Sequence, residues 1–344
     1  MRLLFVCAEV PTPQHIRSYG ILQALAGRGH QITVVCNVAP GTHHAIADLW
    51  ERGIHVLAVA QGQNEQRRSM VRALTSRLPL AVASVCNPRL LASIRDEVAS
   101  GDYAVAHISG LAASGLGQAL GDMPTVLDAG TCASLTLNRR SREGWQQSIR
   151  AALGIVRTRR HEGEYGATYR RIIASSPDDA WALAMLAGHY GTHSPGIHVV
   201  PTPIAPDAQV SSILTLREQE SLLLCSDKAS RAQATLRLAE SVMPQIWRQR
   251  ADVKLLVAGP LPAPLRRSSA EPRIISIGSN NPQAVGRATI ALAPDGSESA
   301  DSALHALSCG TPLIASHMIG RALAGGDGRT MLLADEPTKQ ARAV

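Results

Sequence analysis

The chain has 344 residues, of which 45% are hydrophobic and 18% charged. A chain of this length and composition buries a sizeable core, as one large α/β unit or two ordinary domains, which excludes wholesale disorder. Its 34 Lys and Arg residues outnumber 27 Asp and Glu residues and give a net charge of +7, while aromatic residues make up only 3%. Because single-strand nucleic-acid binding needs aromatic stacking platforms, we expect no nucleic-acid partner. Anionic membrane surfaces and phosphorylated small molecules remain as partners of a basic chain.

Apolar runs typical of buried strands alternate with helical stretches along most of the chain. In the first half, the predicted strands cover 3–10, 32–37, 54–60, 104–109, 125–130, 171–176 and 197–201. The predicted helices there include 15–27, 43–52 and most of an arginine-rich stretch from 139 to 171. The second half repeats the pattern, with strands at 221–226, 253–259, 273–278, 289–294 and 311–316 and helices at 230–249 and 299–308. Buried strands joined by helices predict parallel sheets with right-handed crossovers.

Prolines interrupt this pattern between the two halves, at Pro195, Pro201, Pro203 and Pro206. Proline ends helices and strands, so this stretch predicts a domain boundary. We expect a Rossmann-like domain at 1–185, a linker at 186–215 and a second, C-terminally short Rossmann-like domain at 216–344. The predicted fold class is α/β, with the two parallel sheets facing a central cleft.

The spacing of the cysteines and the lengths of the apolar runs indicate the cellular compartment. The six cysteines occur singly, without a CxxC pair, and several lie in apolar runs, which is typical of reduced, buried thiols. The apolar run at 3–10 is too short for a signal peptide, and no run reaches the ~18 residues that a membrane-spanning helix requires. We therefore expect a cytoplasmic protein without disulfides and without a metal site.

Several catalytic motifs are absent from the sequence. There is no GxxxxGK[ST] phosphate loop, no GxGxxG after a strand, no GxSxG, no HExxH and no DxD. These absences argue against an ATPase, a dinucleotide-dependent dehydrogenase, a serine hydrolase of the nucleophile-elbow type and a metal-dependent sugar transferase.

Six phrases, spread in order over nearly the whole chain, resemble a known family. They are HIRSYGILQALAGRGHQITVVC (15–36), VAHISG (105–110), RTRRHEGEYGATYRRIIASSPDDAWAL (157–183), VVPTPI (199–204), VMPQIWRQRADVKLLVAG (242–259) and HALSCGTPLIAS (305–316). Together they are similar to glycosyltransferases of the GT-B fold, and in particular to family-four-type sugar transferases from exopolysaccharide clusters of the exosortase-associated kind.

The resemblance implies an activity and its partners. A GT-B enzyme of this kind holds the diphosphate of its sugar donor on the C-terminal domain, with a helix N-terminus and basic side chains. The acceptor docks on the N-terminal domain. Fixed dipoles and cations stabilise the leaving diphosphate, so no metal or other cofactor is needed. The expected reaction is a retaining, metal-independent transfer of a sugar from a nucleotide-diphosphate sugar to a saccharide or lipid-linked acceptor.

The resemblance also implies site residues. His107 ends the run AVAH and matches the family's histidine beside the transferred sugar, although a satisfied histidine at a strand end is the alternative. Arg17 matches the opening of the helix after the first strand. Lys228 and Arg231 follow the strand SLLLCS and replace the cation that grips the diphosphate, unless they are ordinary surface cations at a helix start. These residues are assigned to donor binding, and His107 to catalysis.

Other positions depart from the family pattern. The glycine-rich turn after the first strand reads PTPQ here, and the Gly-Arg/Lys pair after SLLLCS falls on Leu224 and Cys225. The two glutamates that contact sugar and ribose fall on Ser297 and His305, and Glu298 lies one residue along. Glu298, Asp301 and His305 are spaced i, i+3, i+7 on one helix face, and one interpretation is a repurposed polar site. The alternative is that the acids complement the helix dipole and that His305 is simply half-buried. Ser297, Glu298 and His305 are the positions assigned to donor binding. The losses support an alternative function, an inactive homologue that acts as the partner subunit of another glycosyltransferase. A nucleotide-sugar epimerase is a third hypothesis.

The positive charge is concentrated in one segment. Between Arg139 and Arg171 there are nine arginines, no lysine and three glutamates, a net +6 of the chain's +7. One interpretation is a solvated helix face. The other is contact with anionic lipid or with a lipid-diphosphate acceptor, which would place the protein at the inner face of the membrane.

Overall fold

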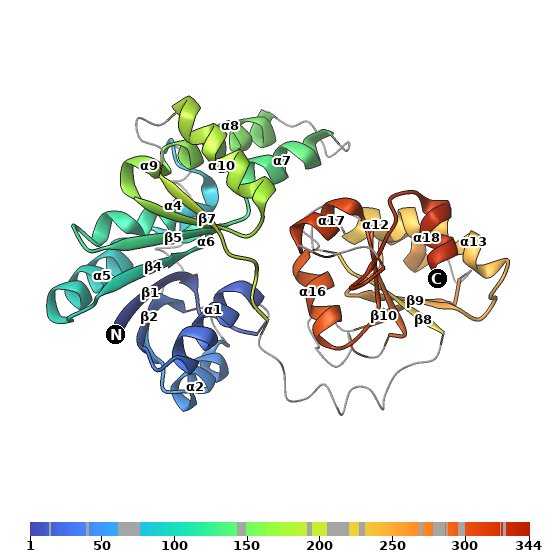
Figure 1. Ribbon diagram of the computed structural model, residues 1–344, viewed down its shortest axis with the longest axis horizontal. Coiled ribbons are helices and arrows are strands. Elements are labelled where there is room, and N and C mark those ends of the chain that lie inside the picture. The colour runs from blue at the N-terminus through green and yellow to red at the C-terminus, as the bar shows by residue number, and fades with distance from the viewer. Residues whose placement is uncertain are drawn as a thin grey trace. The chain divides into compact units, whose positions relative to one another are not determined.

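The computed structural model describes residues 1–13, 15–38, 41–60, 76–142, 149–190, 195–204, 220–226, 231–267, 271–277, 286, 288–294, 300–323, 325 and 328–344. The chain divides into two compact units, Met1–Pro203 and Ile204–Val344, each an α/β layer structure (Figure 1). The division falls inside the stretch 186–215 that the sequence suggested as a linker. Residues 196–199 of that stretch form a strand of the first unit.

The first unit contains a seven-stranded parallel sheet in the order β3-β2-β1-β4-β5-β6-β7. Its strands are β1 (Arg2–Glu9), β2 (Gln31–Val38), β3 (His55–Ala60), β4 (Val105–Ser109), β5 (Thr125–Gly130), β6 (Arg171–Ala174) and β7 (Gly196–Val199). The order changes direction between β1 and β4. In open parallel sheets, ligands bind beyond the carboxyl ends of the strands at such a switch point.

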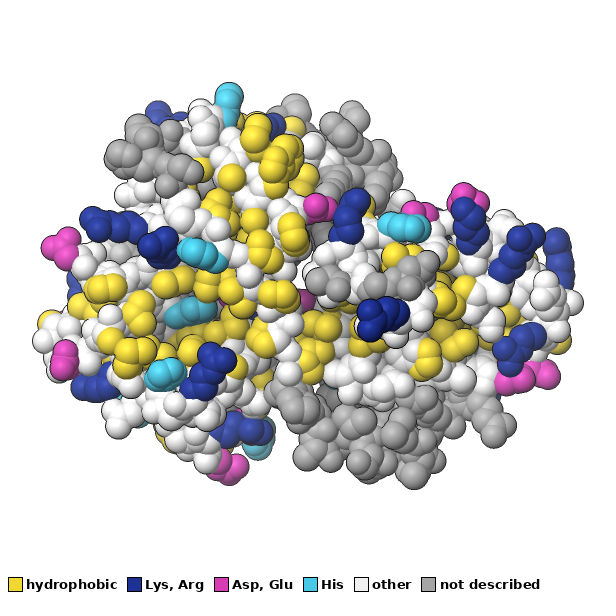
Figure 2. Space-filling view, in the orientation of Figure 1, with side chains coloured by type: hydrophobic (Ala, Val, Ile, Leu, Met, Phe, Trp, Pro, Cys, Tyr) yellow, Lys and Arg dark blue, Asp and Glu magenta, His cyan; other side chains and the backbone are white. Residues whose placement is uncertain are grey.

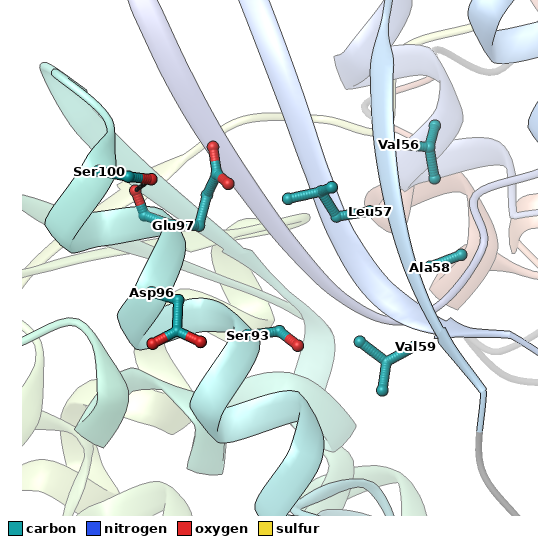
Figure 3. A pocket seen from close by; sticks show the side chains of 8 residues that line it. All are labelled: Val56, Leu57, Ala58, Val59, Ser93, Asp96, Glu97 and Ser100. Atoms are coloured by element: carbon teal, nitrogen blue, oxygen red, sulfur yellow. Dashed lines mark hydrogen bonds between the residues drawn. The ribbon is translucent and has the colours of Figure 1, made fainter.

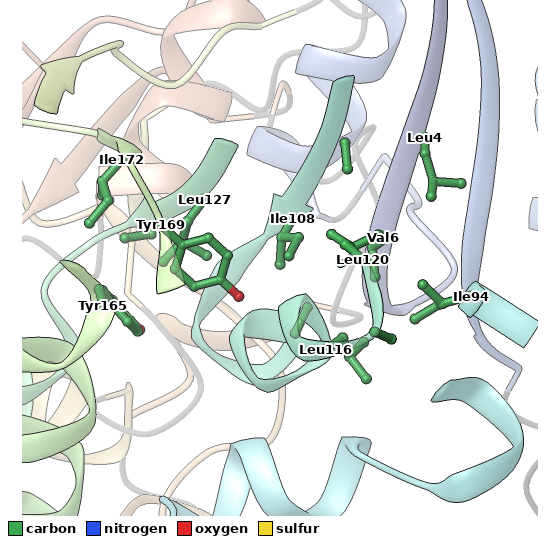
Figure 4. Packing of buried hydrophobic residues seen from close by; sticks show 14 of the residues in the cluster. Leu4, Val6, Ile94, Ile108, Leu116, Leu120, Leu127, Tyr165, Tyr169 and Ile172 are labelled. Carbon is green, nitrogen blue, oxygen red and sulfur yellow. The ribbon is translucent and has the colours of Figure 1, made fainter. Parts of the chain in front are cut away.

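Helices cover both faces of this sheet. They are α1 (Ile16–Gly27), α2 (His43–Glu51), α4 (Leu80–Val85), α5 (Pro88–Ser100), α6 (Gly110–Ala113), η1 (Ser114–Ala119), α7 (Ala133–Arg142), α8 (Ile149–Gly163), α9 (Tyr165–Thr168) and α10 (Pro177–Tyr190). Side chains of β1 alternate between two cores, since Phe5 packs with Leu22 and Leu49 of α1 and α2, while Leu4 packs with Ile94 of α5 (Figure 4). Burial of each such side chain contributes about 1.5–3 kcal/mol.

The second unit contains a six-stranded parallel sheet in the order β10-β9-β8-β11-β12-β13. Its strands are β8 (Ser221–Leu224), β9 (Lys254–Ala258), β10 (Ile274–Ile277), β11 (Ile290–Ala293), β12 (Leu313–Ala315) and β13 (Leu332–Leu333). Its helices are α12 (Arg231–Arg237), η3 (Leu238–Val242), α13 (Met243–Trp247), α14 (Ala263–Arg267), α16 (Ala300–Ser308), α17 (His317–Ala322) and α18 (Pro337–Ala343). Two α/β units with parallel sheets confirm the predicted fold class.

The predicted helix at 230–249 contains a local irregularity. Its middle, η3, is a π-helical segment between α12 and α13. Pro244 lies in the first turn of α13 and has no N–H to donate to the carbonyl of Glu240, so the ordinary i→i−4 ladder is interrupted there. α18 packs against η3 and α13, and the side chain of Gln340 donates to the carbonyl of Ala334 (3.0 Å). None of the described helices is both long and apolar enough to cross a membrane.

Candidate functional site

Polar side chains of the first unit meet at the carboxyl edge of β1, β4 and β5. Arg17, in the first turn of α1, donates from Nε and Nη2 to Oδ1 of Asp128, near the end of β5, at 2.9 and 2.7 Å. The side chains are 13% and 1% exposed. Asp128 also accepts from the backbone N–H of Gly130 (3.2 Å), whose φ of +63° turns the chain sharply at the end of the strand. A buried, doubly hydrogen-bonded ion pair therefore lies at the sheet's switch point.

The same arginine reaches the segment that follows β7. Its Nη1 donates to the carbonyl of Val200 (2.8 Å), and the hydroxyl of Thr202 lies 3.4 Å away. Arg17 thus ties α1 to β5 and to residues 200–202. Its guanidinium has internal partners at Nε, Nη1 and Nη2, so the assignment of Arg17 to donor binding stays a prediction.

His107 lies within β4 and does not end it, because the strand continues through Ile108 to Ser109. Its ring stacks on Phe5, with centroids 4.4 Å apart and planes at 18°. Nε2 lies 3.8 Å from Oδ2 of Asp128 and, within the described chain, is buried without a hydrogen-bond partner. Burial holds the pKa of His107 below its ordinary value, against the opposing pull of the Asp128 carboxylate. The imidazole is therefore neutral at pH 7.

Two serines lie beside this cluster. The hydroxyls of Ser18, on α1, and Ser109, at the end of β4, are 2.7 Å apart. Gly110 follows with a φ of +81° and starts α6. Sequence reasoning did not single out Asp128 or Ser109 as site residues. The signal was present in the runs TVLDAG and VAHISG, where a polar residue and a glycine end a buried strand.

A second buried hydrogen-bond network satisfies the backbone N–H groups at the start of α7. Glu162, on α8, accepts from the backbone N–H groups of Ala133 (2.7 Å) and Ser134 (3.1 Å) at the start of α7. Burial raises the pKa of Glu162, and these hydrogen bonds oppose the rise. Asp179, on α10, accepts from the N–H of Cys132 (2.9 Å). These carboxylates satisfy helix-end donors, so their role is structural.

In the second unit, Arg231 and Gly259 come together at the carboxyl ends of β8 and β9. Gly259 follows β9 with a φ of +124°, a conformation that side chains rarely adopt. A Cβ there would lie 2.5 Å from Nη1 of Arg231, at the start of α12. The glycine therefore lets the guanidinium lie over the backbone. Nearby, Arg237 donates from Nη2 to the carbonyl of Pro294 (3.2 Å), after β11.

His305 is half-buried on α16, the helix after β11. Its carbonyl accepts from the hydroxyl of Ser308 (2.7 Å). Arg231 and His305 thus lie on helices that follow two adjacent strands, β8 and β11. Lys228, Ser297 and Glu298 lie outside the described residues, so their assignments stay predictions.

A hollow of about 600 Å³ lies elsewhere in the first unit, between β3 and α5 (Figure 3). It is lined by Val56, Leu57, Ala58, Val59, Ser93, Asp96, Glu97 and Ser100. The charged groups in this lining are carboxylates, and one of them, Glu97, accepts a hydrogen bond from the hydroxyl of Tyr103. An acidic lining disfavours the phosphate groups that the basic chain was expected to bind.

Known structures share the fold of this chain. Residues 220–344 match the family model described as glycosyl transferases group 1. The structure of the Anabaena protein HepE, solved with UDP and glucose, is 14% identical, with a TM-score of 0.61 over 99% of this chain and 88% of that one. The fold is GT-B.

Two further structures share this GT-B fold. The UGT2 of Phytolacca americana, solved with UDP-2-fluoro-glucose and pterostilbene, is 12% identical over 98% of this chain and 89% of its own, with a TM-score of 0.56. A protein described as a putative UDP-N-acetylglucosamine 2-epimerase from Listeria monocytogenes is also 12% identical, over 99% and 86%, with a TM-score of 0.56. No curated protein is similar in sequence. At these identities the likeness establishes the GT-B fold alone, and different activities occur on it.

Proposed function

We propose that this protein transfers a sugar from a nucleoside-diphosphate sugar to a saccharide or lipid-linked acceptor. The observation that carries the proposal is the match of residues 220–344, nearly all of the second unit, to a glycosyltransferase family model. The GT-B structures solved with UDP or a UDP-sugar support the same class of donor. The family resemblance adds a role in exopolysaccharide synthesis at the cytoplasmic face of the membrane.

The second unit supplies groups suited to the donor's diphosphate. Arg231 presents a permanent cation beside the backbone of Gly259, where the missing side chain allows a close approach. Phosphate oxygens bind guanidinium groups through charge-assisted hydrogen bonds. A fixed cation stabilises the diphosphate as it leaves, and the proposed reaction therefore uses no metal. Lys228 adds a second cation in this proposal.

The first unit supplies a neutral imidazole. The side chain of His107 is 12% exposed, and its buried Nε2 lacks a hydrogen-bond partner among the described residues. We assign it a hydrogen bond to a hydroxyl of the transferred sugar, which satisfies that nitrogen and orients the sugar for transfer with retention of configuration. Asp128 lies 3.8 Å away and acts as a positioning residue, because its ion pair with Arg17 fixes the charge beside the ring.

An inactive homologue that acts as a partner subunit is the second candidate. The observation that favours it is His305 on α16, which occupies a position where the resemblance expects a glutamate. In that case the two-unit fold persists, and the protein contributes a binding surface to an active glycosyltransferase.

The decisive experiment is an assay of nucleoside-diphosphate release. The purified protein is incubated with a panel of UDP- and GDP-sugars, with and without a saccharide acceptor and with and without a chelator. We expect acceptor-stimulated release that a chelator leaves unchanged and that His107→Ala lowers at least about tenfold. His198→Ala, an exposed histidine on β7, is the matched control. Absence of release with every donor, together with co-purification of another transferase, supports the partner subunit instead.

A further inference from the structure

The outer faces of α8 and α10 expose large apolar side chains. α10 contains the run AWALAMLAG at 180–188, nine residues without a charge, yet Trp181 is 68% and Met185 57% exposed. On α8, Val156 is 58% and Leu153 48% exposed. Scattered apolar side chains are normal on a surface, but a run of them on two packed helices marks an interaction site.

The two helices form one surface. α10 packs against α8, and a Cβ on Gly163 of α8 would lie 2.6 Å from Cβ of Tyr190 of α10. Figure 2 shows hydrophobic side chains gathered on the part of the first unit where Figure 1 places these helices. We call the surface formed by Leu153, Val156, Trp181 and Met185 the apolar face.

Basic side chains border the apolar face. Arg159 and Arg160 are exposed on α8, within one turn of Val156. Glu162 is buried under the start of α7 and Glu164 pairs with Arg160 (2.7 Å), while Asp178 is half-buried one turn before Trp181. Arg157, Arg159 and Arg160 outnumber the accessible acids Glu164 and Asp178, so the described border is net positive.

We propose that the apolar face with its arginine border docks onto the surface of an anionic lipid bilayer. Tryptophan and aliphatic side chains enter the boundary between headgroups and acyl chains, while arginines bind lipid phosphates. The positive charge favours an anionic bilayer over a second copy of this chain. In a symmetric dimer the two apolar faces would bring their arginine borders together, and like charges repel. The proposal specifies the membrane contact of the arginine-rich segment and is independent of sugar transfer.

Flotation with phosphatidylglycerol–phosphatidylcholine vesicles, compared with pure phosphatidylcholine vesicles, tests the proposal. We expect binding to the anionic vesicles only. The double variant Trp181→Ser, Met185→Ser lowers the partition coefficient about tenfold or more, because it removes the largest inserted side chains. Arg159→Gln with Arg160→Gln lowers it about fivefold for each arginine that contacts the surface. Trp50→Ser is the matched control, since Trp50 is 58% exposed on α2 and lies outside the apolar face.

Three outcomes would overturn the proposal. The unmodified protein fails to bind anionic vesicles, or the arginine variant loses binding while the serine variant binds fully. The third is that the protein dimerises without vesicles and the serine substitutions abolish the dimer. All substituted side chains are exposed, and circular dichroism confirms that each variant is folded. Nucleoside-diphosphate release measured without vesicles tests the proposed function separately.

Discussion

Arg17 and Asp128 lie 111 residues apart in the chain and form a buried, doubly hydrogen-bonded ion pair at the carboxyl edge of the first sheet. The pair fixes a carboxylate 3.8 Å from Nε2 of His107 and anchors the segment after β7 through the carbonyl of Val200. It therefore links the geometry of the candidate site to the stability of the unit.

Breaking this ion pair should destabilise the first unit. Asp128→Asn leaves the Arg17 guanidinium without its countercharge in a nearly buried site, and we expect the free energy of unfolding to fall by about 3 kcal/mol. Urea unfolding followed by circular dichroism measures it. Glu336→Gln, which removes the partner of Lys339 in an exposed pair, should cost less than about 1 kcal/mol.

A double-mutant cycle tests the coupling itself. Arg17→Met combined with Asp128→Leu removes both charges, and the double variant should be more stable than the sum of the single effects predicts. Strict additivity would show that the two side chains contribute independently and would contradict this interpretation.

Stability should depend on pH through two partly buried histidines. Burial holds the pKa values of His107 and His161 below the ordinary value, so the folded imidazoles stay neutral while the unfolded ones take up protons below about pH 6.5. Their contribution to stability is present above that pH and is lost as the pH falls towards the folded pKa values. Each histidine adds a slope of at most about 1.4 kcal/mol per pH unit.

Urea unfolding at pH 7.5, 6.5 and 5.5 measures these slopes. The variants His107→Gln and His161→Gln should each lose less stability than the unmodified protein between pH 6.5 and 5.5. His198→Gln, an exposed control on β7, should follow the unmodified protein. Equal slopes in all four proteins would show that neither partly buried histidine titrates on unfolding.

The carboxylate of Glu162 should stabilise the start of α7. Glu162→Ala removes the acceptor of the Ala133 and Ser134 N–H groups, which are then left unsatisfied, and we expect a loss of about 2–3 kcal/mol. Glu164→Ala, at the first residue after α8, removes an exposed partner of Arg160 and should cost about 0.5 kcal/mol. Thermal unfolding compares the two, and similar losses would argue against a cap at Glu162.

A side chain at Gly259 should disturb the second unit. Gly259→Ala imposes a φ of +124° on alanine and places its Cβ 2.5 Å from the Arg231 guanidinium. We expect a loss of about 1–3 kcal/mol and weaker donor binding. Gly27→Ala, near the end of α1 with open space around it, should be neutral or stabilising by up to about 1 kcal/mol. An unchanged donor affinity in Gly259→Ala would show that this glycine does not contribute to donor binding.

Local patterns predicted most of the fold. The runs LLFVCAEV and ITVVCN correspond to β1 and β2 within one residue at each end, because buried parallel strands are continuous apolar segments. β13 has two residues, Leu332 and Leu333, which is too short for any periodic signal. The π-helical segment before Pro244 also escaped prediction, since one proline does not reveal whether a helix ends or adapts.

The candidate site was harder to predict. The sequence singled out His107 as a candidate, and its role stays a prediction. Its contact with Phe5 depends on the register of neighbouring strands. The sequence placed Asp128 in a predicted strand and gave no sign of its role in the site. Its partner Arg17 comes from another element 111 residues away, and no local spacing encodes that contact. Long-range pairing of charged groups is a property of the folded topology.

The most direct test of the central claim is a calorimetric titration of the intact protein with UDP, GDP and their sugars, in the presence of a chelator. We predict saturable micromolar binding of at least one nucleoside diphosphate, weakened at least about tenfold by Arg231→Gln. Arg248→Gln, an exposed arginine just after α13, should bind like the unmodified protein. Absence of heat with every nucleotide and nucleotide sugar would contradict a donor site in this chain and, with it, the proposed transferase.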